Sequence, residues 1–232
     1  MSARSTLRGI LLFSAGAAAL LAAPAGFPYA GESLNYTVNW PTGLSLGEAH
    51  LRADRTADGW RFEFGIDAAV PGFAISDHYN SGATSDFCSV EFQKEVQHGK
   101  KKTSEKTSID SKRGIAERST SGGGSSEISV PACVKDALTF LYFARRELAQ
   151  GRVPPQQMVL FGAPYQVRLE YTGSQTVSAN EQRVETDRVV VTFKGPASDV
   201  NFEIFFARDP ARTPVVVRAP FPLGTFSMEL VR

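Results

Sequence analysis

Apolar and polar residues alternate along most of the chain. The alternation recurs in segments that begin at Leu34, Leu44, Trp60, Val90, Tyr165, Val189, Val200, Val215 and Phe226. Turn-forming sequences at 58–59, 194–199 and 208–214 separate several of them. A period of two puts one face of a strand on a core and the other in water, which is typical of antiparallel sheets. The sequence therefore predicts a mainly β protein.

One segment predicts a helix instead, over about 134–150. Asp136 can cap its start, and Gly151 can end it in the left-handed conformation. Residues 138–144 are apolar nearly all round, which is typical of a helix buried on most sides. We therefore expect a strongly curved antiparallel sheet, or a half-open barrel, wrapped around one mostly buried helix.

The phase of the alternation changes at Gly47. Leu44 and Leu46 occupy one parity, whereas Ala49 and Leu51 occupy the other. A glycine at such a change suggests a β-bulge, which would bend the sheet. The alternative is that Gly47 marks a break between two separate strands.

The first 25 residues have the pattern of a secretory signal peptide. Arg4 and Arg8 precede an apolar run at 9–23, and small residues lie before a cleavage point near Ala25. An uncleaved anchor is the alternative, but the run would span only about 22 Å as a helix, against a hydrocarbon core of about 30 Å. We expect a periplasmic protein in which 26–232 form a single β-rich domain. Within it, 119–127 are expected to form a flexible loop.

Charge and cysteine content narrow the classes of partner. Removal of Arg4 and Arg8 changes the formal net charge from +1 to −1, so we expect no nucleic acid partner. No other segment is long and apolar enough to span a membrane, and we expect a monomer. In an oxidising compartment, Cys88 and Cys133 predict a disulfide. The alternative, two thiols with a shared metal or redox role, has no CxxC motif or histidine at metal spacing to support it.

Three consecutive lysines, Lys100, Lys101 and Lys102, lie at the expected turn of a hairpin. They are a candidate docking patch for an anionic head group or an acidic partner. The alternative is a solvated hairpin whose lysines protect a sheet edge, and the acidic residues interspersed nearby favour it.

Aromatic residues are candidates for the lining of a ligand cavity. More often such residues fill a core, and their number favours that alternative here. The candidates are Trp40, Trp60, Phe64, Phe92, Phe140 and Tyr142.

No local motif predicts catalysis, a metal or a cofactor. His50, His78 and His98 have no second histidine at metal spacing, and the nucleophile elbow, phosphate-binding loop and dinucleotide fingerprint are absent from the sequence. Asp77 and His78 are neighbours on a strand and would point to opposite faces. A Ser-His-Asp site assembled from distant strands stays open, and a close His–carboxylate pair in a cleft would be its first sign.

Three segments, in this order, resemble the exported bacterial proteins of domain of unknown function 3108. They are GESLNYTVNWPTGLSLGEAHL, the helix entry DALTFLYFARRELAQG and the hairpin ARDPARTPVVV. The positions that match are Gly31, Glu32, Tyr36, Gly43, Gly47, Asp136, Arg145, Gly151, Asp209 and Pro214. The resemblance implies an exported β-rich protein without an assigned activity. The family is similar in outline to the LolA and LolB carriers, in which a half-open barrel covers helices and an apolar cavity, but this likeness transfers no residue roles.

Export, the curved sheet and the outline likeness favour a non-catalytic envelope carrier or chaperone. Its ligand would be apolar, such as a lipid or a lipoprotein acyl chain, and the helix would act as a movable lid or plug. The alternative is an interaction or scaffold module for envelope assembly, which would use a sheet edge or the lysine turn. An enzyme with a dispersed site is the third hypothesis.

Overall fold

The computed structural model describes residues 28–70, 73–179, 181–196, 199–221 and 224–231, so the expected signal peptide lies outside the described residues. The helix is α1 (Ala137–Ala149). The strands are β1 (Glu32–Asn39), β2 (Ser45–Arg55), β3 (Gly59–Val70), β4 (Phe73–Thr84), β5 (Ser89–His98), β6 (Lys101–Asp110), β7 (Ile115–Thr120), β8 (Ser125–Ser129), β9 (Lys135–Asp136), β10 (Gln157–Phe161), β11 (Ala163–Ala179), β12 (Gln182–Lys194), β13 (Asp199–Ala207), β14 (Pro214–Phe221) and β15 (Gly224–Val231).

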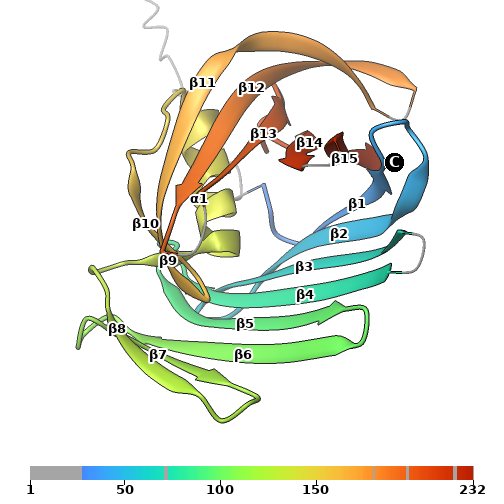
Figure 1. Ribbon diagram of the computed structural model, residues 1–232. Coiled ribbons are helices and arrows are strands. Elements are labelled where there is room, and N and C mark those ends of the chain that lie inside the picture. Colours follow the sequence, from blue (N-terminus) through green and yellow to red (C-terminus); the bar gives the residue numbers. More distant parts are fainter. Residues whose placement is uncertain (1–27, 71–72, 180, 197–198, 222–223, 232) are drawn as a thin grey trace, which may run out of the picture.

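All the strands of the described residues belong to one sheet. Its order is β8-β7-β6-β5-β4-β3-β2-β1-β15-β14-β13-β12-β11-β10-β9, so the first and last strands of the chain are neighbours in its middle. Neighbouring strands are antiparallel, except that β9 runs parallel to β10. The sheet curves strongly but is not closed into a barrel, because β8 and β9 remain its two edges (Figure 1). The prediction of a mainly β fold with a strongly curved sheet is confirmed.

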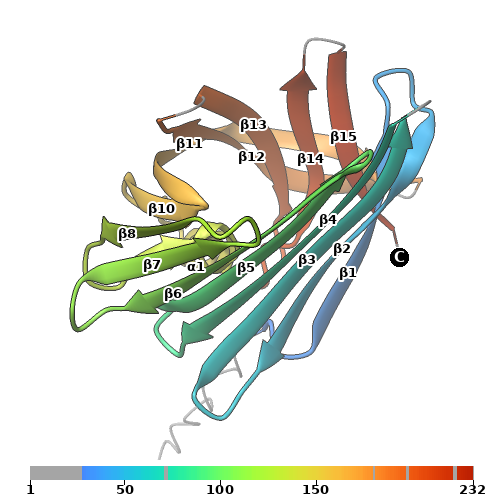
Figure 2. The ribbon, with the colours of Figure 1, turned by 60° about the horizontal axis from the view of Figure 1, so that its bottom comes forward.

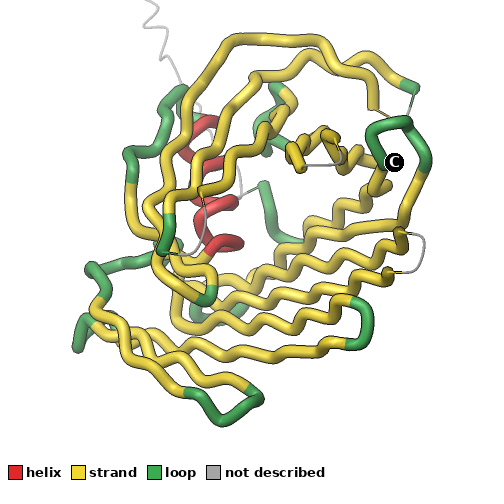
Figure 3. The backbone as a smooth tube through the Cα atoms, in the orientation of Figure 1, coloured by secondary structure: helices red, strands yellow, loops and turns green. Residues whose placement is uncertain are grey.

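The helix α1 lies inside the curve of the sheet (Figures 1 and 3). One side of α1 packs through Leu138 and Tyr142 on buried residues of β1–β5. The other side packs through Phe140, Ala144 and Leu148 on β10–β13. Two walls of one sheet thus bury opposite sides of α1, which explains why its middle is apolar nearly all round.

The β-bulge near Gly47 is present. Val38 pairs with Gly47 and Asn39 pairs with Ser45, so Leu46 is the extra residue of β2. A Cβ atom added to Gly47 would lie 2.0 Å from the carbonyl oxygen of Asp67 on β3. The glycine therefore allows β3 to approach β2 directly beside the bulge.

The structure differs from the sequence prediction at several segments, and β10 is one that no alternation marked. Residues 119–127, expected as a flexible loop, form the facing ends of β7 and β8 and the turn between them. The helix begins at Ala137 rather than near 134, because Lys135 and Asp136 pair with Val159 and Leu160 as β9. The sequence pattern does not mark β4, because its inward positions include polar residues that hide the alternation.

The hairpin turns of the sheet gather at two ends. Because the strands are antiparallel, β1, β3, β5 and β12 finish where β2, β4, β6 and β13 begin. We call this the open end of the sheet; Figure 2 shows it along the upper side, with α1 below. On the β1–β5 arm the contacts of α1 lie toward the opposite end, with the start of β1 and the end of β4. On the other arm the residue before α1, Asp136, pairs with Leu160 near the end of β10.

Candidate functional site

An apolar pocket of about 240 Å³ lies between α1 and the concave face of the sheet. Side chains from α1 and from strands of both walls line it. They are Phe64, Tyr79, Ala137, Leu138, Phe140, Leu141, Ala144, Phe161, Leu169, Val191, Phe193, Phe202, Ile204, Phe206, Val217 and Met228. The Tyr79 hydroxyl, the one polar side-chain group in this lining, donates a hydrogen bond to Asp77. The pocket therefore suits an apolar ligand, because its lining has almost no group that could hydrogen-bond a polar one.

The apolar pocket continues toward the open end of the sheet. A second hollow of about 300 Å³ shares Ala137, Phe161, Phe193 and Phe202 with it. Val200, which also lines this second hollow, is 43 % exposed. We call the second hollow the mouth of the pocket.

The start of α1 is held by a buried carboxylate. Asp136 accepts hydrogen bonds from the backbone N–H groups of Leu138 and Thr139, which confirms the predicted cap. Its other oxygen accepts from the hydroxyls of Ser81 at 2.6 Å and Ser89 at 2.5 Å. Burial raises the pKa of Asp136, although the hydrogen bonds from the serines and Thr139 act against this. The start of α1 is thereby tied to β4 and β5.

The other end of α1 is held by a buried ion pair. The Arg145 guanidinium, with no exposed side-chain surface, donates to both oxygens of Glu32, at 2.6 and 2.7 Å. It also donates to the carbonyl oxygens of Ala211 and Arg212. The Tyr142 hydroxyl donates to Glu32 at 2.9 Å. Burial disfavours the charge of Arg145, but hydrogen bonding and the charge of Glu32 outweigh this and raise the pKa of Arg145.

These contacts make α1 the floor of the pocket. The Asp136 carboxylate, directly before α1, is hydrogen-bonded to β4 and β5. Arg145, in the second half of α1, is hydrogen-bonded to β1 and to the segment before β14. This arrangement favours a fixed floor over the movable lid expected from the sequence.

Several family-motif positions gather at this ion pair. Glu32 and Arg145 form it, and the Tyr36 hydroxyl donates to the carbonyl oxygen of Pro214. Asp209 accepts from the backbone and hydroxyl of Thr213, which shapes the turn before β14. Gly31, Gly43 and Gly151 have φ angles of 76°, 88° and 72°, which favour glycine. In the structure, the motif supports the fold rather than the pocket lining.

A polar cluster that the sequence did not predict lies on the concave face near the open end. The His98 imidazole contacts Asp77 at 3.0 Å, and Tyr79 donates to the same carboxylate at 3.1 Å. Burial and the charge of Asp77 raise the pKa of Tyr79. Asp77 and His78 were predicted to point to opposite faces of their strand. This is confirmed, because the ring of His78 lies near Asp67 and Ser76 and not near Asp77.

Asp77 with His98, and Glu63 with His50 at 3.2 Å, are close His–carboxylate pairs of the kind expected at a dispersed catalytic site. Among the described residues, however, the side-chain contacts of His98 are with Asp77 and the ring of Phe73. A base needs a nucleophile within hydrogen-bonding reach, and no hydroxyl or thiol in the described ranges fills that position.

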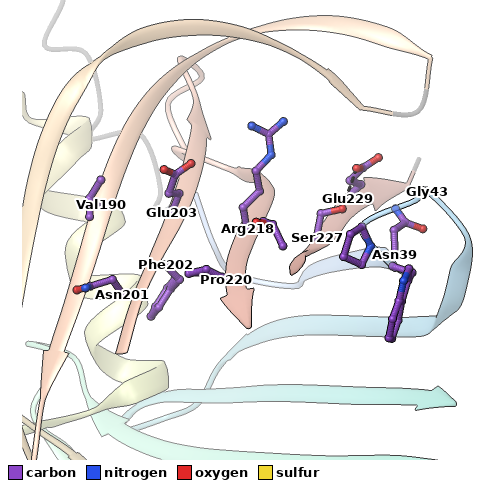
Figure 4. Close-up of a pocket in the computed structure, with 13 residues that line it drawn as sticks. Asn39, Gly43, Val190, Asn201, Phe202, Glu203, Arg218, Pro220, Ser227 and Glu229 are labelled. Carbon is purple, nitrogen blue, oxygen red and sulfur yellow. Dashed lines mark hydrogen bonds between the residues drawn. The ribbon is translucent and has the colours of Figure 1, made fainter. Parts of the chain in front are cut away.

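A larger, polar groove of about 610 Å³ lies beside β12–β15 and the segment after β1. Asn39, Ser227, Arg218 and Glu203 follow one another across four paired strands. In Figure 4, Glu203 and Arg218 project to one side and Phe202 to the other. Glu203 is hydrogen-bonded to Arg188, and the Arg218 guanidinium lies 4.8 Å from the Phe205 ring centroid. The mixed charges of this open groove favour no single class of ligand.

The predicted cavity residues separate into three groups. Phe64 and Phe140 line the apolar pocket. Trp40 lines the polar groove, and its ring packs on Phe226 at 4.8 Å. The others lie in the packed core rather than in the pocket, because aromatic neighbours surround them: Trp60, Phe92 and Tyr142.

The predicted disulfide and the lysine turn are both present. Cys88 and Cys133 are bonded, which links the start of β5 to the segment before α1. Lys100 lies between β5 and β6, and Lys101 and Lys102 begin β6, all exposed. In the part of the chain that the structure describes, no helix could cross a membrane, and no group of three His, Cys, Asp or Glu side chains could hold a metal ion.

Comparison with known proteins identifies a family and a related fold. No curated protein matches the chain. A solved structure, the β-barrel-like protein of domain of unknown function DUF1849 from Brucella abortus, is similar with a TM-score of 0.57 and 10% sequence identity. The similarity covers 86% of this chain and 95% of the other, and at this identity it shows the fold alone. The suggested likeness to LolA and LolB stays a prediction.

The sequence profile of DUF3108, described as a protein of unknown function, matches residues 35–231. This range contains the helix entry, the closing hairpin and most of the opening motif. The chain therefore belongs to the DUF3108 family.

Proposed function

We propose that the protein is a non-catalytic carrier that holds an apolar ligand in the pocket above α1. The observation that supports this most strongly is the apolar lining of the pocket, which continues into an apolar mouth. A lipid or the acyl chain of a lipoprotein has the matching chemistry.

The packing of the protein interior makes this pocket notable. Interiors are close-packed with few voids, so a hollow of about 240 Å³ lined by Phe, Leu, Ile and Val side chains forgoes dispersion contacts. An acyl chain would recover those contacts and gain about 0.8 kcal/mol for each buried CH₂ group. The fixed floor supports this use, because a pre-formed site loses little conformational entropy on binding.

The proposed setting is the periplasm, after removal of residues 1–25. The disulfide is compatible with an oxidising compartment. Function as a scaffold module for envelope assembly stays the alternative prediction.

The test is a substitution at Ala137, which lines both the pocket and its mouth. Ala137→Trp would place a large ring where the two hollows meet. We expect native mass spectrometry of detergent-free wild-type protein to show a lipid mass that Ala137→Trp lacks. We also expect a dansyl-labelled fatty acid to bind the wild type and not this variant.

The matched control is Ala149→Trp, at the exposed last residue of the same helix. It should bind the labelled fatty acid as the wild type does. Equal binding by Ala137→Trp and wild type, with both folded by circular dichroism, would show that the pocket is not the binding site.

A further inference from the structure

Large apolar side chains are exposed around the open end of the sheet. Leu44 precedes β2, Phe73 begins β4 and Val200 lies at the start of β13. Their exposed fractions are 65%, 46% and 43%. They come from three separate strand ends that the antiparallel order brings to the same end of the molecule. We call these three residues the apolar rim; one of them, Val200, also lines the mouth of the pocket.

The basic turn lies directly beside this rim. The N–H of Gly99 donates to the carbonyl oxygen of Ala74 at 2.7 Å, and the Phe73 ring lies 6.1 Å from the His98 ring. Lys100 and Lys101 are exposed, and within the described ranges neither has a carboxylate at ion-pair distance. Lys102 differs, because its ammonium lies 3.9 Å from Glu95. Two uncompensated positive charges thus adjoin an exposed aromatic ring.

The opposite end of the sheet lacks this combination in its described turns. The turn between β2 and β3 consists of Thr56, Ala57 and Asp58. The turn between β6 and β7 carries Lys112 and Arg113 but no large apolar residue. Val90 and Val231 are also exposed at that end. Among the described residues, however, the apolar hollow adjoins the open end.

We propose that the open end docks on a lipid bilayer that carries anionic head groups. Phe73 and Leu44 enter the interfacial layer, and Lys100 and Lys101 contact the head groups. The mouth then faces the membrane, and an acyl chain passes into the pocket without crossing water. This inference rests on the proposed carrier function and specifies where its ligand enters and leaves.

The strength of such docking suits a carrier. Each lysine near an anionic surface contributes about a fivefold gain in affinity, so two lysines and two apolar tips give reversible rather than permanent attachment. Screening by salt should weaken it.

Co-sedimentation with vesicles tests the proposal. The wild type should bind vesicles of phosphatidylglycerol and phosphatidylcholine at low salt, and bind phosphatidylcholine alone much more weakly. Lys100→Gln/Lys101→Gln should lower the apparent affinity for the anionic vesicles about thirtyfold. Phe73→Ser/Leu44→Ser should also weaken it.

The matched control is Lys112→Gln/Arg113→Gln, which removes two positive charges at the other end of the same strand, β6. It should bind as the wild type does. An equal loss in the control, or no preference of the wild type for anionic vesicles, would overturn the docking proposal.

Three further outcomes distinguish this proposal from others. Binding of the dansyl-labelled fatty acid by Lys100→Gln/Lys101→Gln, with vesicle binding lost, supports docking as a separate property of the open end. Fatty acid binding without any vesicle binding by the wild type overturns docking and leaves the carrier function standing. A wild-type dimer in light scattering that Phe73→Ser/Leu44→Ser dissociates, without vesicle binding, would assign the rim to a second copy of the chain.

Discussion

At the scale of single residues, the buried pair of Glu32 and Arg145 has the largest energetic consequence. Its two charges are almost fully removed from water, and the Tyr142 hydroxyl and two backbone carbonyl groups add three further hydrogen bonds. A buried charge whose partner is removed costs far more than the pair itself contributes. The pair therefore determines whether the end of α1 stays attached to β1.

We expect Glu32→Gln to lower the free energy of unfolding by about 3–5 kcal/mol, because Arg145 would remain charged in an apolar setting. Urea unfolding followed by circular dichroism measures the change. The double variant Glu32→Gln/Arg145→Met should lose less than the two single changes together, since no charge is then left unpaired.

The control for this prediction is Glu170→Gln, which breaks the pair with Arg168 on an exposed face of β11. Solvent screens that pair, so the midpoint of unfolding should hardly move. A Glu32→Gln variant as stable as Glu170→Gln would contradict the assigned role of the buried pair.

The local sequence was sufficient to predict the ends of α1, but it could not predict the ion pair of Glu32 and Arg145. Asp136 and Gly151 act through neighbours within a few residues, so their roles as cap and terminator could be read from the sequence. Glu32 and Arg145 are 113 residues apart. The family resemblance marked both positions, but only the fold shows that they meet.

At the scale of elements, the bulge in β2 combines an extra residue with a close approach of the next strand. Leu46 is unmatched on β1, and the missing side chain of Gly47 makes room for the backbone of β3. Such a bulge bends its strand locally and increases its twist.

We expect Gly47→Ala to destabilise the protein by about 1–3 kcal/mol, because its methyl group would lie against the carbonyl of Asp67 and force strands apart. Thermal or urea unfolding provides the measurement. Gly122→Ala is the control, since an added Cβ there meets no atom within 4 Å. If both variants unfold alike, the close approach does not require glycine.

Strand prediction succeeded where the inward face is apolar and failed where it is not. Trp60, Phe62 and Phe64 alternate along β3, and the sequence marked that strand. The inward residues of β4 include Asp77 and Ser81, which bond to His98 and Asp136. Those polar contacts satisfy buried groups, but they remove the apolar period that identifies a strand.

At the scale of the whole molecule, the disulfide joins the two parts that must meet to make the pocket. Cys88 lies directly before β5, and Cys133 lies before α1, 45 residues later in the sequence. Together with the Asp136 hydrogen bonds, it fixes the floor against the wall.

We expect Cys88→Ala/Cys133→Ala to lower the free energy of unfolding by about 2–4 kcal/mol, because the unfolded chain regains the entropy of the open loop. Urea unfolding with and without reductant measures this. Reductant should shift the wild type toward the variant and leave the variant unchanged. Identical stabilities of oxidised and reduced wild type would refute the prediction.

The architecture could be predicted more fully than the pocket. Alternation and one apolar helix indicated a curved sheet around a helix, but whether its interior was filled depends on the spacing between α1 and both walls. That spacing arises from pairings such as β1 with β15, which no local pattern encodes. Phe64 and Phe140 line the pocket and Trp60 fills the core, although all three look alike in sequence.

The adjacency of β1 and β15 has a consequence for how the chain acquires its structure. Each arm of the sheet, β1–β8 and β10–β15, consists mainly of hairpins between consecutive strands, which form by short loop closure. Their junction requires residues such as Tyr36 and Leu230 to find each other across nearly the whole chain. High contact order of this kind slows folding, and until the junction forms both arms present an unpaired strand edge. A chaperone that shields those edges would then act at the last step of folding, after the hairpins are complete.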